Sequence, residues 1–303
     1  MRILGAGVLV LFTSVSGFAQ ETQAPPPVFE TRVNSVFIDT FVTEKDVPIS
    51  GLLARDFVLK DNGTRQPFEL IPTASLPTRT LLVFDTSDSV SGAKLERLQA
   101  TAQSLLDHLR PEDEAGLISF SEEIALLSPL TTDHTKVRMA LLRLKASGAT
   151  SLYDALATAL ILPRSALRTL ILVFSDGEDN NSWVTARQLR QLVERSNALL
   201  YVVAARSASF TSGLVRPGTR GEDSYTSRLR AIATITGGSL LEVTSADHIG
   251  PAFASIIEKM RSRYVLRYDP ENEPAAGWHR LEVQLSGRRG DVTNRSGYWV
   301  EKP

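Results

Sequence analysis

The sequence lacks cysteine and has little histidine, and both shortages restrict the chemistry open to it. With no cysteine among 303 residues, thiolate zinc sites, iron–sulfur clusters, a cysteine nucleophile and disulfide bonds are all excluded. The four histidines are scattered along the chain, at positions 108, 134, 248 and 279. Any bound metal is therefore expected to be a hard cation held by oxygen ligands.

An excess of either charge is also missing. Lys and Arg total 33 and Asp and Glu total 34, which gives a net charge of −1. Because nucleic-acid-binding proteins usually carry a basic excess, no nucleic-acid partner is expected. The same balance excludes a polyanionic disordered chain, and a hydrophobic fraction of 43% is typical of a soluble globular protein. At about 150 residues per domain, the length indicates one large and one small domain.

Long hydrophobic runs are absent after the first twenty residues, MRILGAGVLVLFTSVSGFAQ. This segment has one arginine, an apolar stretch and small residues at Gly17 and Ala19, the pattern of a signal peptide (1–19) cut after Ala19. The apolar stretch is shorter than the ~20 residues of a membrane span. We therefore expect an exported protein, periplasmic, secreted or at the cell surface, with no transmembrane span after cleavage. Residues 20–31 are expected to form a proline-rich linker.

The middle of the chain alternates short apolar runs with amphipathic segments. The apolar runs are typical of strands buried on both faces, and the segments between them have the spacing of helices with one apolar face. The main strands are expected at residues 81–84, 169–174, 199–204 and 240–243. This alternation predicts an α/β fold with a doubly wound, mainly parallel sheet, which we assign to residues 77–262.

Both ends of the mature chain are rich in β-strand patterns. In residues 32–76, Asn62 and Gly63 predict a tight hairpin turn between strands at 57–60 and 67–71. Residues 263–303 include a strand in which apolar and polar residues alternate. Each end has too few strands to be stable alone. We therefore predict that the two ends pack together as a small β-rich module flanking the α/β domain.

Oxygen-bearing side chains follow two of the apolar strands. Asp85, Ser87 and Ser89 form a D-x-S-x-S motif directly after one strand, and Asp176 follows another. Because sites in parallel sheets form at the carboxyl ends of the strands, we expect these side chains to lie together. Thr150, before the helix at 152–162, offers a further hydroxyl. Five oxygen ligands with two formal negative charges suit Mg²⁺, which could then accept a carboxylate from a partner.

These five residues resemble the metal-ion-dependent adhesion site of von Willebrand factor A domains. The surrounding segments LLVFDTSDSV, ATSLYDAL and LILVFSDGED are similar as well, and the flanking segments look like the exported von Willebrand factor A-related proteins of Acidobacteria. The resemblance implies a doubly wound sheet, bound Mg²⁺ or Mn²⁺ with Ca²⁺ as a further candidate, and protein–protein adhesion. The acidic residues of the second, Ca²⁺-binding site of integrin β-type domains are not matched, because Val90-Ser91-Gly92 follows the motif.

A long polar segment over 207–226 follows the strand at 199–204 and should begin at the edge of the sheet that carries the motif. Long loops in compact domains are often functional. Partner contacts are therefore expected from the charged residues Arg206, Arg216, Arg220, Glu222 and Asp223. The alternative is a plain surface loop with no binding role.

Together these features predict an exported, non-enzymatic protein-binding module that captures an Asp or Glu of a partner through a divalent cation. Two alternatives stay open. One is a hydrolase with a metal-bound water and Asp88, Glu178 or Asp179 as base, although Gly-x-Ser-x-Gly and P-loop motifs are absent. The other is a structural domain whose metal site is idle. Neither the identity of the partner nor the oligomeric state follows from the sequence.

Overall fold

The computed structural model describes residues 35–73, 76–162, 168–177, 179–205, 222–270 and 275–301. The chain divides into two compact units, Met1–Val33 and Asn34–Pro303, and every described residue belongs to the second. The signal peptide and linker expected over residues 1–31 therefore lie outside the described residues. Among the helices of the described part, none is both long and apolar enough to span a membrane.

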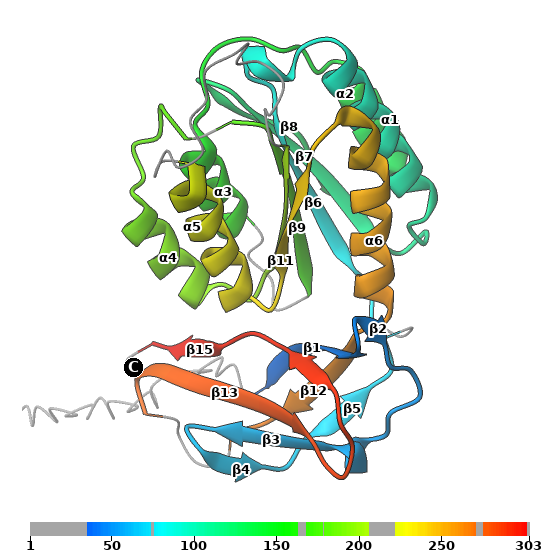
Figure 1. Ribbon diagram of the computed structural model, residues 1–303, viewed down its shortest axis with the longest axis vertical. Helices are drawn as coiled ribbons and strands as arrows, with labels where there is room; N and C mark the ends of the chain where they lie inside the picture. The colour runs from blue at the N-terminus through cyan, green and yellow to red at the C-terminus, as the bar shows by residue number, and fades with distance from the viewer. Residues whose placement is uncertain are drawn as a thin grey trace, which may run out of the picture. The chain divides into compact units, whose positions relative to one another are not determined.

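A six-stranded sheet forms the centre of the α/β domain (Figure 1). Five of its strands are parallel, and one edge strand pairs antiparallel with its neighbour. In spatial order the strands are β11 (Ser239–Val243), β10 (Leu199–Ala205), β9 (Thr169–Ser175), β6 (Arg79–Asp85), β7 (Glu114–Phe120) and the antiparallel β8 (Ile124–Thr131). The chain proceeds from β6 toward one edge and then returns to β9 on the other side of β6. The pair β6 and β9 is therefore the topological switch point of the sheet.

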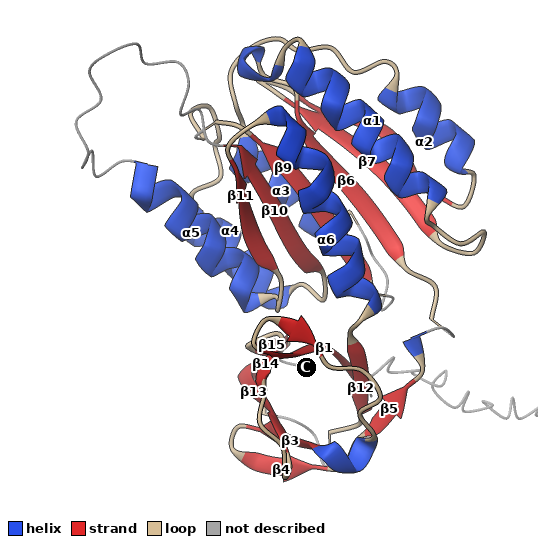
Figure 2. Ribbon diagram, turned by 45° about the vertical axis from the view of Figure 1, so that its right-hand side comes forward, coloured by secondary structure: helices blue, strands red, loops and turns tan. Residues whose placement is uncertain are grey.

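Helices cover both faces of this sheet (Figure 2). One apolar core lies under α3 (Leu152–Ile161), α4 (Ala186–Arg195) and α5 (Glu222–Ile235). A second core lies under α1 (Ala93–Asp107), α2 (His134–Leu141) and α6 (Ile249–Arg261). Because both faces are covered, β6, β9 and β10 are buried along almost their whole length, as their apolar sequences predict. The predicted doubly wound α/β fold is confirmed.

The remaining strands form a small β module around a third core. In one sheet β1 (Val36–Glu44) pairs with β12 (Tyr264–Tyr268) and with β14 (Asp291–Thr293), while β5 (Glu69–Ile71) pairs with β12 and β2 (Val47–Pro48) with β1. The other sheet has the order β15 (Gly297–Val300), β13 (Gly277–Leu285), β3 (Phe57–Asp61) and β4 (Thr64–Gln66). Strands from both ends of the chain thus pair with one another, as predicted for the flanking module.

Two local expectations were wrong. Asn62 and Gly63 do form a hairpin turn with positive φ values of 47° and 83°, but the hairpin joins β3 to β4. The strand expected at 67–71 is the shorter β5, which pairs with β12 instead. The second error concerns the polar segment at 207–226, because α5 begins at Glu222 and residues 222–226 are therefore helical.

Two buried arginines connect the α/β domain to the β module. Arg263, directly before β12, donates to the carbonyl of Asp39 at 3.1 Å and to the hydroxyl of Tyr201 at 3.0 Å. Arg295 donates to Oδ1 of Asn197 at 2.6 Å. Burial lowers the pKa of Arg295 to about 10, so the guanidinium remains charged at neutral pH. A buried charge without hydrogen-bond partners would be strongly destabilising. The hydrogen bonds of Arg263 and Arg295 offset this cost.

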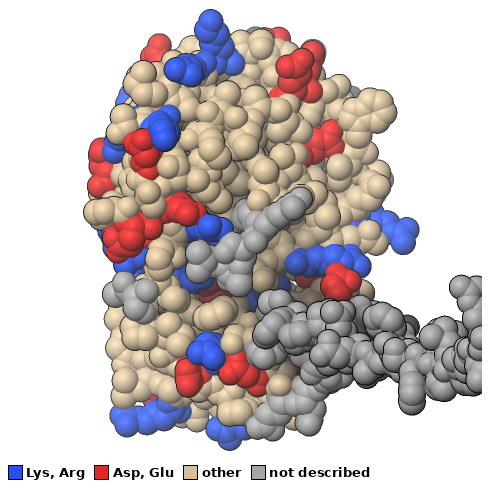
Figure 3. All heavy atoms as spheres, turned by 180° about the vertical axis from the view of Figure 1, so that it is seen from behind, with Lys and Arg blue, Asp and Glu red and all other residues tan. Residues whose placement is uncertain are grey.

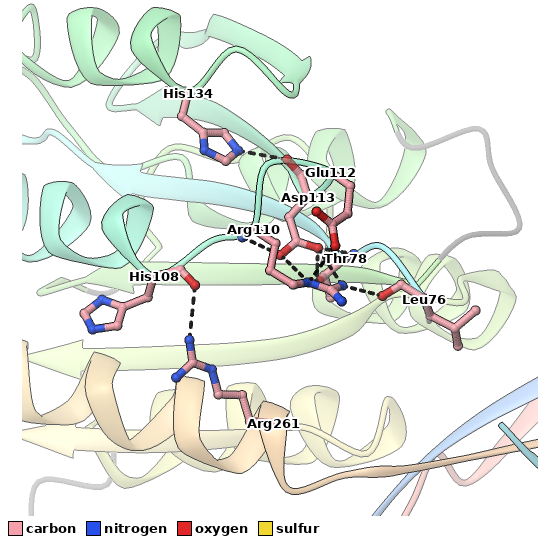
Figure 4. A network of polar contacts seen from close by, with 8 residues as sticks. All are labelled: Leu76, Thr78, His108, Arg110, Glu112, Asp113, His134 and Arg261. Carbon is pink, nitrogen blue, oxygen red and sulfur yellow. Dashed lines mark hydrogen bonds and ion pairs between the residues drawn. The ribbon is translucent and has the colours of Figure 1, made fainter. Parts of the chain in front are cut away.

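A second polar network holds the start of the α/β domain in place (Figure 4). Oδ1 of Asp113 accepts hydrogen bonds from the backbone and hydroxyl of Thr78 at 2.8 and 2.9 Å and from Arg110 at 3.0 Å. Arg110 also donates to the carbonyl of Leu76 at 2.7 Å. Burial alone would raise the pKa of Asp113, but the hydrogen bonds from Arg110 and Thr78 lower it to about 2. The segment entering β6 is thereby fixed at the amino end of the sheet.

Acidic and basic side chains are interspersed on the face of the molecule shown in Figure 3. Ion pairs at the surface of the described residues include Arg190–Glu194 at 3.0 Å and Arg230–Glu242 at 2.7 Å. Such exposed pairs contribute little stability because water screens them. The mixture of signs agrees with the net charge of −1.

Candidate functional site

The loop after β6 begins at a buried carboxylate. Asp85 ends β6 and is fully buried. Its Oδ1 accepts a hydrogen bond from the backbone N–H of Ser87 at 2.9 Å, and its Oδ2 accepts one from Oγ of Ser175 at 2.6 Å. Burial raises the pKa of Asp85, the hydrogen bonds from Ser175 and Ser87 oppose this, and the nearby charge of Asp176 adds to the rise. Asp85 therefore fixes the start of the loop and links it to the end of β9.

Ser87, Ser89 and Asp176 form a hydrogen-bonded chain between the loop after β6 and the loop after β9. The hydroxyls of Ser87 and Ser89 lie 3.1 Å apart, and the Ser89 hydroxyl donates to Oδ1 of Asp176 at 2.5 Å. Ser87 and Ser89 come from the loop after β6, whereas Asp176 directly follows β9. The structure thus brings together side chains that are 87 residues apart in the sequence, at the switch point of the sheet.

Thr150 lies at the same place. A side-chain carbon built on Gly177 would be 3.5 Å from the hydroxyl oxygen of Thr150 and 4.0 Å from that of Ser89. Both hydroxyls therefore border the small space beside Gly177. The Thr150 backbone is held on both sides, because its N–H donates to Oδ1 of Asn180 at 2.9 Å and its carbonyl accepts from the Asn180 N–H at 3.0 Å. All five residues of the expected site are consequently near one another.

The donor set of this site consists mainly of hydroxyl oxygens. Within the described residues, no three His, Asp or Glu side chains gather into a metal-binding group. A cation beside Ser87, Ser89 and Thr150 would be held by neutral oxygens and water, with two carboxylates close by. Mg²⁺ prefers oxygen ligands and retains several waters, so the residues present fit a hard divalent cation.

Lys94 also belongs to the site, although its position in the sequence did not indicate this. It is the second residue of α1, and its ammonium donates to Oδ2 of Asp176 and to the carbonyl of Ser89 at 3.0 Å. The Asp176 side chain is fully buried, whereas that of Lys94 is 23% exposed. The spacing of Lys94 in α1 predicts only an exposed helix position, so no signal in the sequence indicated this contact.

Tyr225 was missed for a different reason. It lies in the first turns of α5, and its buried hydroxyl approaches Ser175 without the geometry of an ordinary hydrogen bond. Burial raises the pKa of Tyr225 above its usual value, as do the charges of Asp85 and Asp179. The residue was expected in a loop, and only the early start of α5 brings it against the site.

An exposed tryptophan stands on the loop between β9 and α4. Trp183 is 92% exposed, although its backbone N–H donates to Oδ2 of Asp154 at 3.0 Å. The next N–H, of Val184, donates to Oδ1 of the same carboxylate at 2.7 Å. A well-anchored loop therefore presents a large apolar side chain to solvent, on the loop that also carries Asn180.

The other expected site residues fall into two groups. Arg206, Arg216 and Arg220 lie outside the described residues, as does Glu178. Of Glu222 and Asp223, the structure describes only the helical backbone at the start of α5. Among the candidate bases that are described, Asp88 is exposed, and Oδ1 of Asp179 accepts from the Ser182 hydroxyl and from the Tyr153 N–H at 3.2 Å.

Comparison with known proteins gives matches at both the sequence and the structure level. Residues 80–178 match the von Willebrand factor type A domain family. The chain is 29% identical over 167 residues to inter-alpha-trypsin inhibitor heavy chain H4 of Bos taurus, covering 50% of this chain and 18% of that protein. It is 27% identical over 117 residues to heavy chain H2 of Homo sapiens, covering 34% and 12% respectively. The chain thus spans less than a fifth of the length of these curated relatives.

Two solved structures are similar in fold. A von Willebrand factor type A protein from Catenulispora acidiphila aligns with a TM-score of 0.51 at 12% identity, covering 83% of this chain and 74% of that one. The vWF domain of the type V pili tip protein Mfa5 from Porphyromonas gingivalis aligns with a TM-score of 0.50 at 13% identity, covering 61% and 95%. At these identities the similarity establishes the fold alone.

Proposed function

The chain contains a von Willebrand factor type A domain, and from this premise we propose that the protein is an exported module that binds a partner protein through a divalent cation. Proteins with such domains act in protein–protein interaction, and one structural neighbour is a pilus tip protein. The specific proposal is that the cation sits beside the hydroxyls of Ser87, Ser89 and Thr150 and accepts an Asp or Glu carboxylate of the partner. Mg²⁺ is the proposed ion, with Mn²⁺ and Ca²⁺ as alternatives.

One observation carries this proposal: the hydroxyls of Ser87 and Ser89 and the carboxylate of Asp176 form one hydrogen-bonded chain across two strand ends. Ser89 donates its proton to Asp176, so a lone pair of its oxygen remains for a cation. The hydroxyl of Thr150 borders the same space. Asp85 holds the Ser87 backbone at 2.9 Å and so keeps the loop in this conformation.

The formal charges favour an anionic ligand for the loaded site. The carboxylates of Asp85 and Asp176 and the ammonium of Lys94 leave one negative charge. A divalent cation would change this to one positive charge and supply a point of attachment for a carboxylate. Charge-assisted contacts of that kind are stronger than neutral hydrogen bonds. The proposed residues thus bind and orient, and no bond-breaking step is assigned to them.

The metal part of the proposal is tested by thermal unfolding of the chelator-treated protein with and without MgCl₂. Free Mg²⁺ at a hundredfold excess over Kd should stabilise the wild type by about 2.7 kcal/mol. Asp85→Ala should abolish this gain. Asp88→Ala is the matched control, because Asp88 lies in the same loop but is exposed, and it should keep the gain. Equal Mg²⁺ dependence in the two variants would contradict the assignment.

The partner part is tested by affinity capture from the exported proteins of the source cell, in Mg²⁺ and in chelator. A protein retained by the wild type in Mg²⁺, released by chelator and not retained by Asp85→Ala would support the proposal. Turnover of a substrate that is lost in Asp88→Ala would favour the hydrolase alternative instead. Retention that is indifferent to Mg²⁺ would favour a structural role with an idle site.

A further inference from the structure

Lys94 places an ammonium group beside the proposed cation site. Its ammonium contacts Oδ2 of Asp176 and lies 3.0 Å from the carbonyl oxygen of Ser89. The contact is sheltered, because the Asp176 side chain is fully buried and that of Lys94 only 23% exposed. Gly92, with a φ of 67°, precedes α1 and turns the chain so that Lys94 can reach back over the loop.

Both oxygens of Asp176 are engaged as a result. Oδ1 accepts the Ser89 hydroxyl at 2.5 Å, and Oδ2 accepts the Lys94 ammonium. A carboxylate with an ammonium on one oxygen and a hydroxyl on the other is a poor direct ligand for a cation. The ammonium also repels a divalent ion bound at the neighbouring hydroxyls, and such repulsion is strong where water is partly excluded.

We propose that Lys94 is a positioning residue that holds Asp176 out of direct contact with the cation. This inference rests on the proposed function, namely that Ser87, Ser89 and Thr150 bind a divalent ion. Lys94 lowers the affinity for the ion and, in return, keeps the loaded site positively charged. An ion that is incompletely neutralised by its protein ligands binds a carboxylate from outside more strongly. Lys94 therefore weakens the binding of the metal and strengthens the binding of an acidic partner to the metal-loaded site.

A purely structural ion pair would behave differently from a positioning residue. If Lys94 only anchored α1 to the loop after β9, its removal would lower the stability of the protein in chelator, and metal binding would be strengthened at most by the loss of charge repulsion, with the waters on the ion unchanged. If it holds Asp176 away from the ion, its removal also lets a carboxylate oxygen replace a bound water. The two roles thus differ in the number of waters left on the ion, and tighter binding with unchanged water relaxation would overturn the positioning role.

The experiment uses Mn²⁺ alone as the probe, with free Mn²⁺ measured by electron paramagnetic resonance on the full chain. Lys94→Met, which keeps the length of the side chain without its charge, should bind Mn²⁺ at least about tenfold more tightly than the wild type. Lys94→Arg keeps the charge and should stay within about threefold. Water proton relaxation should fall in Lys94→Met, because a carboxylate oxygen replaces a bound water. Circular dichroism in chelator verifies folding, and Lys94→Gln serves as a second neutral variant.

Unchanged or weaker Mn²⁺ binding in a folded neutral variant overturns the inference while leaving the proposed function intact. Absence of Mn²⁺ binding in the wild type and in both neutral variants overturns the proposed function and this inference with it. Tighter binding in Lys94→Met that is lost again in Lys94→Met/Asp176→Asn supports the inference, because Asp176 is then the group that Lys94 restrains.

Discussion

The guanidinium of Arg168 donates to both carboxylate oxygens of Asp39, with its Nε 3.1 Å from Oδ2. Arg168 directly precedes β9, and Asp39 lies in β1 of the β module. The two side chains are only 8% and 16% exposed. This two-point contact fixes the amino edge of the central sheet against the β module, next to the hydrogen bonds of Arg263.

Arg168→Met should lower the free energy of unfolding by about 3 kcal/mol, because it leaves the Asp39 carboxylate buried without its cation. The double variant Arg168→Met/Asp39→Leu should recover part of the loss, since the Asp39 carboxylate is then no longer left without its partner, while the buried Arg295 loses the nearby charge of Asp39. Urea unfolding followed by circular dichroism measures both. Equal losses in the single and double variants would show that packing of the arginine, and not the ion pair, stabilises this contact.

The hydrogen bonds of Asp113 should make the fold sensitive to acid. The pKa of this carboxyl is about 2 in the folded protein against 3.8 ordinarily. A lowered pKa stabilises the fold above the ordinary value, so about 2 kcal/mol should be lost as the pH falls from about 4 to about 2. Asp113→Asn should remove this part of the pH dependence in urea titrations. An acid slope in Asp113→Asn equal to that of the wild type would contradict the prediction.

Two buried tyrosines should make the β module sensitive to alkali. The hydroxyls of Tyr268 and Tyr298 both donate to Oδ2 of Asp61, at 2.8 and 2.9 Å. Burial and the Asp61 charge raise the pKa of Tyr298 to about 12 and that of Tyr268 further. In the unfolded chain both ionise near pH 10, so stability should fall between pH 10 and 12 by about 1.4 kcal/mol per pH unit for each tyrosine. In the Tyr298→Phe variant, the contribution of one tyrosine to this fall of stability with pH should be lost. A slope equal to that of the wild type would contradict the prediction.

Gly238 should tolerate no side chain. A carbon built on it would lie 1.8 Å from the carbonyl oxygen of Leu200, in the neighbouring strand β10. Gly238→Ala should therefore force β11 away from β10 and cost more than about 3 kcal/mol, or prevent folding. Gly250→Ala is the matched control, because a carbon there meets only the Thr101 hydroxyl, at 3.6 Å. In helix α6 the control should be neutral or stabilising by up to about 1 kcal/mol. Thermal unfolding distinguishes the two.

The α/β domain was predictable because its strands are buried on both faces. A run such as residues 169–174 has no polar residue except its first, and burial on both faces is its simplest explanation. The β module was harder to predict in detail, because its strands are short and many of them pair with strands that are far away in the sequence. Nothing near Glu69–Ile71 in the sequence indicates a partner in β12. Likewise β14 has three residues, too few for alternation to be recognised.

At the candidate site, the motif predicted which hydroxyls and carboxylates lie together, because each follows a strand end whose position the fold determines. The supporting groups were not predictable. Lys94 reaches Asp176 only through the turn at Gly92, and Tyr225 meets Ser175 only because α5 begins before the apolar spacing does. Such groups depend on local backbone geometry that no spacing rule encodes.

From the pairing of the two chain ends we also expect a particular order of folding. Asp61 and Tyr298 share a hydrogen bond across 237 residues, and closing so long a loop in an unfolded chain is entropically costly. Once the α/β domain has formed, β6 begins and α6 ends at the same edge of its sheet, so the loop is already closed. The β module is therefore expected to assemble last, as the final strands β12, β13 and β15 add to β1 and β3. Slow folding of the α/β domain would therefore delay folding of the β module. Slow folding of the β module should have little effect on the α/β domain.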